Sequence, residues 1–190
     1  MNKFLFLVLL LSFLAGCTTF TPQQITLNPN VTVAESAAGL GKVVALRVSD
    51  ARTDPALGYR TTRSDKDSAI ISNQNLAKLV EQKTYDALRK NSFDITTADS
   101  GSRALKVEIR NLEYTVPTGS WINGINILAA FDVTAKNGDI TYQNLYEIKN
   151  TERVLIKPDQ EKNEALINKA LSDVLQRMLQ DQKLMALLAK

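Results

Sequence analysis

The 190-residue sequence contains no histidine and a single cysteine, Cys17. Histidine is the commonest metal ligand in proteins and the commonest general base near neutral pH. Its absence excludes a Ser-His-Asp triad and zinc sites built from cysteine and histidine. A lone cysteine has no disulfide partner within the chain. The remaining possibilities are catalysis by carboxylates, catalysis by a Ser-Lys pair, or no catalytic activity. We favour the last and expect no catalytic residue, no metal and no conventional cofactor.

The first sixteen residues are typical of an export signal. Lys3 supplies a positive charge, and the apolar run 4–14 that follows is shorter than the roughly 20 residues of a membrane span. Leu14, Ala15 and Gly16 precede Cys17, and this segment resembles the lipobox of bacterial lipoproteins. The resemblance implies cleavage before Cys17 and a covalent lipid on its thiol. The alternative is a secreted protein without an anchor, whose unpaired thiol would enter an oxidising compartment.

The expected lipid determines the expected location. Lipoproteins of this kind carry two or three acyl chains, and each buried CH₂ contributes about 0.8 kcal/mol, so anchoring is stable. Thr18 follows the cysteine, and by resemblance to the enterobacterial sorting rule a residue other than aspartate favours the outer membrane. We therefore expect a protein held at the periplasmic face of the outer membrane, with the inner membrane as the less favoured destination.

Residues 1–16 form the signal, residues 17–41 the lipidated N-terminus and a tether, and residues 42–190 one domain. A domain of this length can bury close to 70% of its unfolded surface. Lys3 is the only charged residue of the signal, so the mature chain keeps 22 basic and 20 acidic groups. This near-neutral balance gives no argument for a nucleic-acid partner.

Hydrophobic periodicity predicts the elements of the domain. The alternating pattern changes phase near Asn111, which predicts a β-bulge. Asn137-Gly138 predicts a hairpin, because both residues tolerate positive φ. The predicted strands are 42–49, 68–72, 93–96, 104–116, 123–136 and 139–156, and the predicted helices are 73–91 and a long one opening at 158–159 with an apolar tail at 184–188.

The order of these elements predicts an α+β fold. We expect a two-layer sandwich, with a mostly antiparallel sheet of about 4–5 strands and two amphipathic helices packed on one face. The first strand–helix–strand unit allows one parallel pair within that sheet.

Several of these features together resemble the YajG-type bacterial envelope lipoproteins. They are the lipobox, the strand 43–49 running into the segment 50–57, the helix 73–90, and the hairpin with its closing helix. The resemblance covers essentially the whole mature domain, and Arg52-Thr53-Asp54 is its most specific element. It implies an envelope lipoprotein of undefined molecular role and brings no catalytic residues. The layout is also similar to small domains of lipoproteins that assist lipopolysaccharide export or peptidoglycan synthases, but a shared fold does not fix function.

Three residues are candidates for a partner-binding surface. Arg52 and Asp54 either face a partner or stabilise their own loop through side-chain hydrogen bonds. Trp121 lies in a loop, where tryptophan is enriched at binding surfaces, or it caps the core. Tyr142 and Tyr146 share a strand face and are expected in the core rather than on a glycan platform. The polar segment 59–67 is either a recognition loop or solvated chain.

We expect a non-enzymatic envelope lipoprotein that binds or helps assemble other envelope components, through the membrane and an unknown envelope protein partner. One alternative is a carboxylate-based hydrolase of cell-wall glycan. It needs two acidic side chains about 5–9 Å apart in a cleft, and Asp50, Asp54 and Asp132 are available. A second alternative is a lipid- or glycan-binding module, which needs an apolar cavity between helices and sheet.

Overall fold

A computed structural model describes residues 21–98, 101–117, 123–154 and 156–190. Cys17, the lipobox residues Leu14, Ala15 and Gly16, and Trp121 lie outside these residues. The elements in chain order are β1 (Gln23–Gln24), β2 (Val43–Asp50), β3 (Gly58–Tyr59), the 3₁₀ helix η2 (Lys66–Ser68), β4 (Ala69–Ile71), α2 (Leu76–Lys90), β5 (Asp94–Thr96), β6 (Arg103–Thr115), β7 (Asn123–Asn137), β8 (Ile140–Val154), α3 (Gln160–Leu179) and α4 (Gln182–Ala189).

Strand β6 is the centre of the sheet. On one side it pairs antiparallel with β7, which pairs antiparallel with β8. On the other side β2 runs parallel to the first half of β6, and β3 meets its second half at Tyr114. The sheet continues from β2 to β5 by the parallel pair that the sequence allowed, and from β3 through β4 to β1.

The α+β class is confirmed, but the strand number is wrong, since the described residues form an eight-stranded sheet. The prediction of 4–5 strands is too low because β1 and β3 have two residues each, too few to show an alternating pattern. Antiparallel pairing holds for the two longest ladders, whereas β2 pairs parallel with both of its neighbours.

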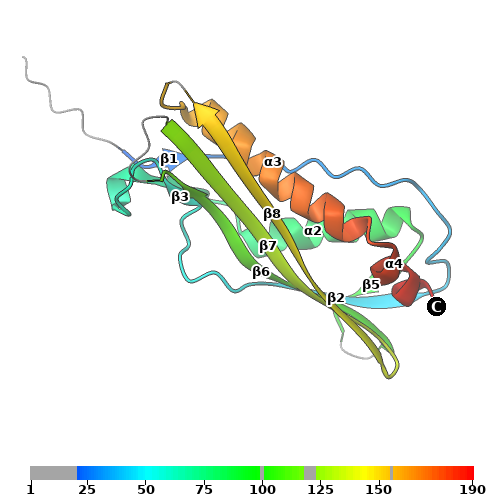
Figure 1. The fold of residues 1–190 in the computed structure, drawn as a ribbon. Helices are drawn as coiled ribbons and strands as arrows, with labels where there is room; N and C mark the ends of the chain where they lie inside the picture. The colour runs from blue at the N-terminus through cyan, green and yellow to red at the C-terminus, as the bar shows by residue number, and fades with distance from the viewer. Residues whose placement is uncertain (1–20, 99–100, 118–122, 155) are drawn as a thin grey trace, which may run out of the picture.

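Helices α2 and α3 cover one face of the sheet (Figure 1). The face of α3 that meets the sheet is completely buried, and each such aliphatic side chain contributes about 1.5–3 kcal/mol. The expected single closing helix is interrupted at Asp181, whose extended backbone and carboxylate form the N-cap of α4. The α3 residues buried at 1% exposure or less include Ile167, Leu171, Val174, Leu175 and Met178.

The β-bulge and the turn of the hairpin strands lie at, or within one residue of, the positions that the sequence predicted. The pairing of β6 with β7 shifts between Ile109 and Asn111, so the predicted bulge is confirmed. The β7–β8 turn has Gly138 and Asp139 as its central residues, and Asn137 is the last residue of β7. Gly138 has a φ of 59° and Asp139 has no positive φ. This arrangement fits a turn with glycine at the first central position, one residue later than the sequence suggested.

Residues 24–32 lie along α3, although the sequence assigned them to the tether. Ile25 and Leu27 are buried, while the backbone of the alternate residues is hydrogen-bonded by polar side chains of the helix. Two residues of extended chain span about 6.6 Å and four residues of helix about 6 Å, so the two periods match. We call this segment the strap. Its bonds join Gln24 O to Gln160, Thr26 N to Glu164, Asn28 N to Asn168, Asn30 N to Ser172 and Thr32 N to Gln176.

Candidate functional site

The segment 51–57 lies where the edge of β6 changes partners. The backbone of β2 leaves β6 after Ala51 N donates to Ile109 O at 3.0 Å. Pairing resumes where Tyr114 N donates to Leu57 O at 2.8 Å. Between these points β6 carries its bulge, and the 51–57 loop turns away from the sheet. The interruption leaves β6 carbonyls that need other hydrogen-bond donors.

Arg52 supplies such a donor. Its Nε and Nη2 bind the two carboxylate oxygens of Asp50 at 3.0 and 2.9 Å, while Nη1 donates to Ala56 O and Leu112 O at 3.2 and 3.4 Å. The side chain is only 9% exposed. A planar guanidinium suits this arrangement because it binds a carboxylate with two donors and keeps others for carbonyls. Arg52 thus joins the end of β2, its own loop and β6.

Asp54 stabilises the second half of the loop. Its Oδ1 accepts from Ala56 N at 2.9 Å, and its Oδ2 accepts from the Tyr59 hydroxyl at 2.7 Å. This hydrogen bond is the main reason that the pKa of Tyr59 is raised. Asp54 itself is exposed. Both charged residues therefore hold their own loop, although Asp54 is also accessible to a partner.

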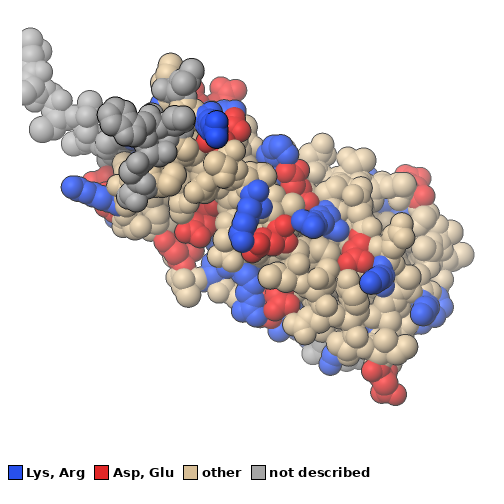
Figure 2. All heavy atoms as spheres, in the orientation of Figure 1, with Lys and Arg blue, Asp and Glu red and all other residues tan. Residues whose placement is uncertain are grey.

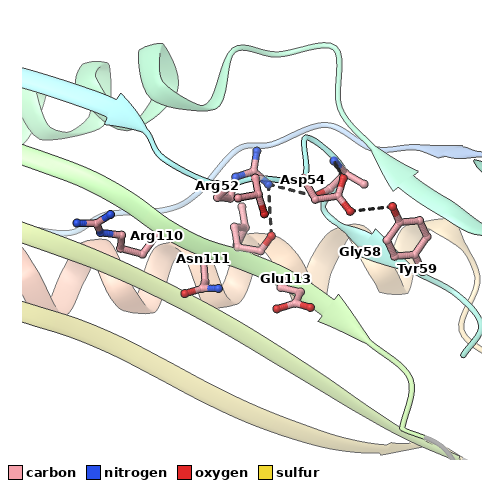
Figure 3. Close-up of a pocket in the computed structure, with 10 residues that line it drawn as sticks. Arg52, Asp54, Gly58, Tyr59, Arg110, Asn111 and Glu113 are labelled. Atoms are coloured by element: carbon pink, nitrogen blue, oxygen red, sulfur yellow. Dashed lines mark hydrogen bonds between the residues drawn. The ribbon is translucent and has the colours of Figure 1, made fainter. Parts of the chain in front are cut away.

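A small hollow of about 140 Å³ lies beside this loop. Figure 3 shows Arg52, Asp54 and Tyr59 above β6, with Arg110, Asn111 and Glu113 extending from the strand. Its volume and polar lining suit a few water molecules rather than an organic ligand.

The three acidic candidates for a glycan hydrolase belong to separate contacts. Asp50 is held by Arg52, and Asp54 by its own loop. Asp132 lies on the open face of the sheet, where Arg110 and Gln143 each contact it at 3.2 Å. Each of the three carboxylates is thus engaged by hydrogen-bond donors of its own surroundings.

The sequence analysis did not predict a partly buried cluster of hydrogen bonds around Asp181. The hydroxyls of Tyr142 and Tyr146 donate to Asp181 Oδ2 at 2.7 and 2.6 Å, and Oδ1 accepts from Lys183 N and Leu184 N at 2.8 and 3.2 Å. Desolvation favours the neutral acid, but the hydrogen bonds outweigh it and lower the pKa of Asp181 to about 2. Burial and this carboxylate raise the pKa of Tyr146.

The cluster explains the position of both tyrosines. Tyr146 is buried and Tyr142 is half-buried, and both face α3 and α4 rather than solvent. The signal that locates the cluster is Asp181 itself, an N-cap residue after a helical pattern. The sequence analysis predicted one continuous helix across Asp181, because the hydrophobic spacing continues into α4.

Strand β8 has an outer edge fifteen residues long. It pairs with β7 in continuous register, and no other described strand pairs with it. A two-residue turn makes Asn137 and Ile140 a hydrogen-bonded pair, and the alternation continues along the ladder. The N–H and C=O groups of the odd-numbered β8 residues therefore point away from β7. Arg177 Nη1 confirms this direction by donating to Glu147 O at 3.0 Å.

The open face beside this edge is charged. Lys149 pairs with Glu147 at 2.9 Å, and Arg110 pairs with Asp132 on the neighbouring strands. Basic and acidic side chains are interspersed over the middle of the molecule in the space-filling view (Figure 2). Two apolar residues of β8 are exposed: Ile140, at the turn, by 57%, and Leu145, between the charged residues, by 56%. Charges of this kind protect an edge strand from non-specific pairing without blocking a specific partner.

Comparison with known proteins assigns the chain to a family and finds a similar fold in a solved structure. Residues 29–189 match the family described as uncharacterized lipoprotein. No curated protein matches the chain. A crystal structure of a DUF330 protein from Xanthomonas campestris shares 12% identity with a TM-score of 0.52, covering 87% of this chain and 95% of its own. A minor lipoprotein from Acinetobacter baumannii shares 13% identity with a TM-score of 0.46, covering 78% of this chain and 93% of its own.

The family match spans most of the chain, whereas the similarity to the Xanthomonas protein concerns the fold alone. Within the described residues, no helix has the length and apolar content that crossing a membrane requires. The predicted resemblance to a bacterial envelope lipoprotein family is confirmed: the chain belongs to the uncharacterized lipoprotein family.

Proposed function

We propose that this lipoprotein is a non-enzymatic accessory of the cell envelope, anchored through a lipid on Cys17 at the periplasmic face of the outer membrane. Its role is to bind another envelope protein by adding a strand of that protein to β8. The observation that carries this proposal is the fifteen-residue outer edge of β8, to which no described strand is paired.

Strand addition suits this edge for two reasons. Main-chain hydrogen bonds provide affinity, and side chains on alternating positions provide specificity. The outward N–H and C=O groups recur at every second residue, and Leu145, Glu147 and Lys149 stand beside them on the open face. A partner strand with an apolar residue flanked by charges of both signs would complement this pattern.

The test uses the full-length protein in living cells. A photoreactive amino acid replaces Lys149, and irradiation is followed by isolation of crosslinked products. We expect one reproducible product containing a second envelope protein. Leu145→Pro removes an outward N–H but leaves the bonds to β7 in place, so it should abolish the product. Leu145→Ala is the matched control and should retain it, and Cys17→Ala reports whether the lipid anchor is needed.

Equal crosslinking by the proline and alanine variants would contradict strand addition. A crosslinked product that contains two copies of this chain would show that the protein associates with itself instead of with another envelope protein. Retention of the product in the Cys17→Ala variant would separate partner binding from membrane anchoring.

A further inference from the structure

A hollow of about 450 Å³ lies between the chain that follows the strap and the helix α4. One wall is formed by the segment 32–38 together with Asn91, and the other by the end of α3 and one face of α4. We call it the α4 groove. It is several times larger than the polar hollow beside Arg52, and its walls are mostly apolar.

Helix α4 is apolar on two sides. The first side is buried and consists of three leucines: Leu184, Leu187 and Leu188. The second side has four residues, spaced i, i+3, i+4 and i+7, that all line the groove: Gln182, Met185, Ala186 and Ala189. Ala186 is exposed, and Met185 and Ala189 are partly exposed. A helix that is apolar all round is normally buried all round, whereas the second side of α4 stays open in the described structure.

Both walls of the groove are held in place. Ser36 N donates to Lys90 O at 3.2 Å, which fixes the first wall to the end of α2. Helix α4 is fixed at its start by the Asp181 cap, and near its end Asn137 Nδ2 donates to Leu187 O at 3.0 Å. The groove is therefore formed before any ligand binds, so binding requires little ordering of the chain.

Lysines surround the groove. Lys183 and Lys190 are exposed and seven residues apart, so they form a stripe beside the groove face of α4. Lys90 lies beyond the other wall, in a neighbouring hollow that shares Val33 with the groove. None of these three lysines forms an ion pair with a described residue. Glu35 is the one acidic residue of the 32–38 wall, and the carboxylate that caps α4 faces β8 instead.

The shape and charge of the groove select its occupant. An acyl chain would stay in contact with water along the open side, whereas an amphipathic helix covers a groove with its apolar face and keeps polar residues outward. Met185 adapts to side chains of different shape. Four small residues on the two walls allow the helix to approach closely: Ala34, Ala38, Ala186 and Ala189. We propose that the α4 groove binds an amphipathic helix of a partner protein, with acidic residues beside its apolar face.

The groove lies far from the lipid anchor of the proposed function. Figure 1 shows α4 at the opposite end of the molecule from the start of the described chain. Where Cys17 carries the lipid, this end points away from the membrane and is accessible to a partner in the periplasm. The groove contains no residue of β8, so this binding is additional to strand addition.

Methyl NMR spectroscopy of the full-length lipidated protein in lipid nanodiscs tests the proposal. Removal of the signal with Met1 leaves two methionines as reporters, since Met185 lines the groove and Met178 is completely buried in α3. The probe is a synthetic helical peptide with leucines at i, i+3, i+4 and i+7 and glutamates on both flanks. We expect this acidic peptide to shift the Met185 signal saturably and to leave the Met178 signal unchanged.

A second peptide, with lysines in place of the glutamates, tests the charge. It should bind at least tenfold more weakly at low ionic strength, because its charges meet the lysines around the groove. Lys183→Glu should reduce this preference from both sides, by weakening the acidic peptide and strengthening the basic one. Lys183 is exposed, and a glutamate in the first turn of a helix is favourable, so the fold should be kept.

A matched pair of variants tests the position. Ala186→Glu should weaken the acidic peptide at least tenfold, because the new side chain fills the groove and carries a repulsive charge. Ala165→Glu makes the same change at an exposed alanine of α3 outside the groove and should bind like the wild type. Leu145→Pro should also bind the peptide normally, so failure of the groove and failure of the β8 edge are distinguishable.

The proposal would be overturned by an unchanged Met185 signal, by equal affinity for the two peptides, or by equal binding to Ala186→Glu and the wild type. A Met185 shift produced by laurate and not by the acidic peptide would replace the helix with an acyl lipid. A Met185 shift that depends only on the protein concentration, and is absent in Ala186→Glu, would identify a second copy of this chain as the occupant.

Discussion

At the scale of single residues, charged side chains in this protein hold irregular backbone in place. Arg52 and Asp181 share this role although one is basic and the other acidic. Each uses several hydrogen bonds outside the regular ladders: Arg52 joins the end of β2 to β6 beyond the point where their pairing stops, and Asp181 joins the hairpin strand β8 to α4. Replacement of either should therefore affect stability more than an exposed charge does.

Arg52→Ala should lower the free energy of unfolding by about 2 kcal/mol or more, because it leaves the Asp50 carboxylate and two carbonyls without their donor. Arg52→Lys should recover only part of the loss, since an ammonium group lacks the planar fork. Lys149→Ala, which breaks an exposed ion pair, should cost less than 1 kcal/mol. Chemical denaturation measures all three. An Arg52→Ala variant as stable as Lys149→Ala would show that the 51–57 loop does not depend on the guanidinium.

Asp181 should make stability depend on pH in acid. Its pKa is lowered from 3.8 to about 2 in the folded protein, so the folded state binds the proton more weakly than the unfolded state. The resulting stabilisation is present above about pH 4 and is lost as the pH falls through 2. Thermal unfolding of Asp181→Asn should therefore differ most from the wild type near pH 5 and least near pH 2. A difference that does not change with pH would assign the effect to the cap and not to the charge.

At the scale of elements, the strap is held along α3 by polar side chains of the helix rather than by a strand partner. Asn168 makes two of its bonds: Oδ1 accepts from Asn28 N at 2.7 Å, and Nδ2 donates to Thr26 O at 2.9 Å. Asn168→Ala should cost about 1–2 kcal/mol, even though alanine favours the helix. Lys169→Ala, the adjacent exposed residue of α3, is the control and should cost less than 0.5 kcal/mol.

Hydrogen exchange locates that effect. The amides of Thr26, Asn28 and Asn30 should exchange faster in Asn168→Ala, while those of β6 and β7 should keep their protection. A uniform increase over the whole domain would mean that the strap does not open on its own.

The elements that the sequence predicted are those with a strong hydrophobic period. The long strands β6 to β8, the helices α2 and α3, and the bulge at Asn111 all follow from alternating or helical spacing. The strap also alternates, with Ile25, Leu27 and Val31 and, just beyond its end, Val33 at odd-numbered positions, but this pattern does not reveal that its backbone is bound by side chains of α3 about 140 residues further along the chain. The short strands β1 and β3, the break at Asp181 and the loop contacts of Arg52 likewise depend on tertiary partners far along the chain.

At the scale of the whole molecule, the chain has two unlike ends. The described chain begins at the end of the sheet where β7 starts and β8 ends, while the β7–β8 turn lies at the far end of two fifteen-residue strands. Fifteen residues of β-strand span about 50 Å. A lipid on Cys17 would therefore hold the end of the sheet where β7 starts toward the membrane and direct the Gly138-Asp139 turn into the periplasm.

This orientation can be measured because Cys17 is the only cysteine of the chain, so once Cys17 is acylated an introduced cysteine is labelled uniquely. Thr62→Cys places a fluorophore in the loop after β3, beside the start of β7, and Asp139→Cys places one at the turn. With the full-length lipidated protein in vesicles that contain spin-labelled lipid, the fluorophore at residue 62 should be quenched strongly and that at residue 139 hardly at all, because quenching acts over much less than 50 Å. Equal quenching would mean that the domain lies flat on the membrane or turns freely on its anchor.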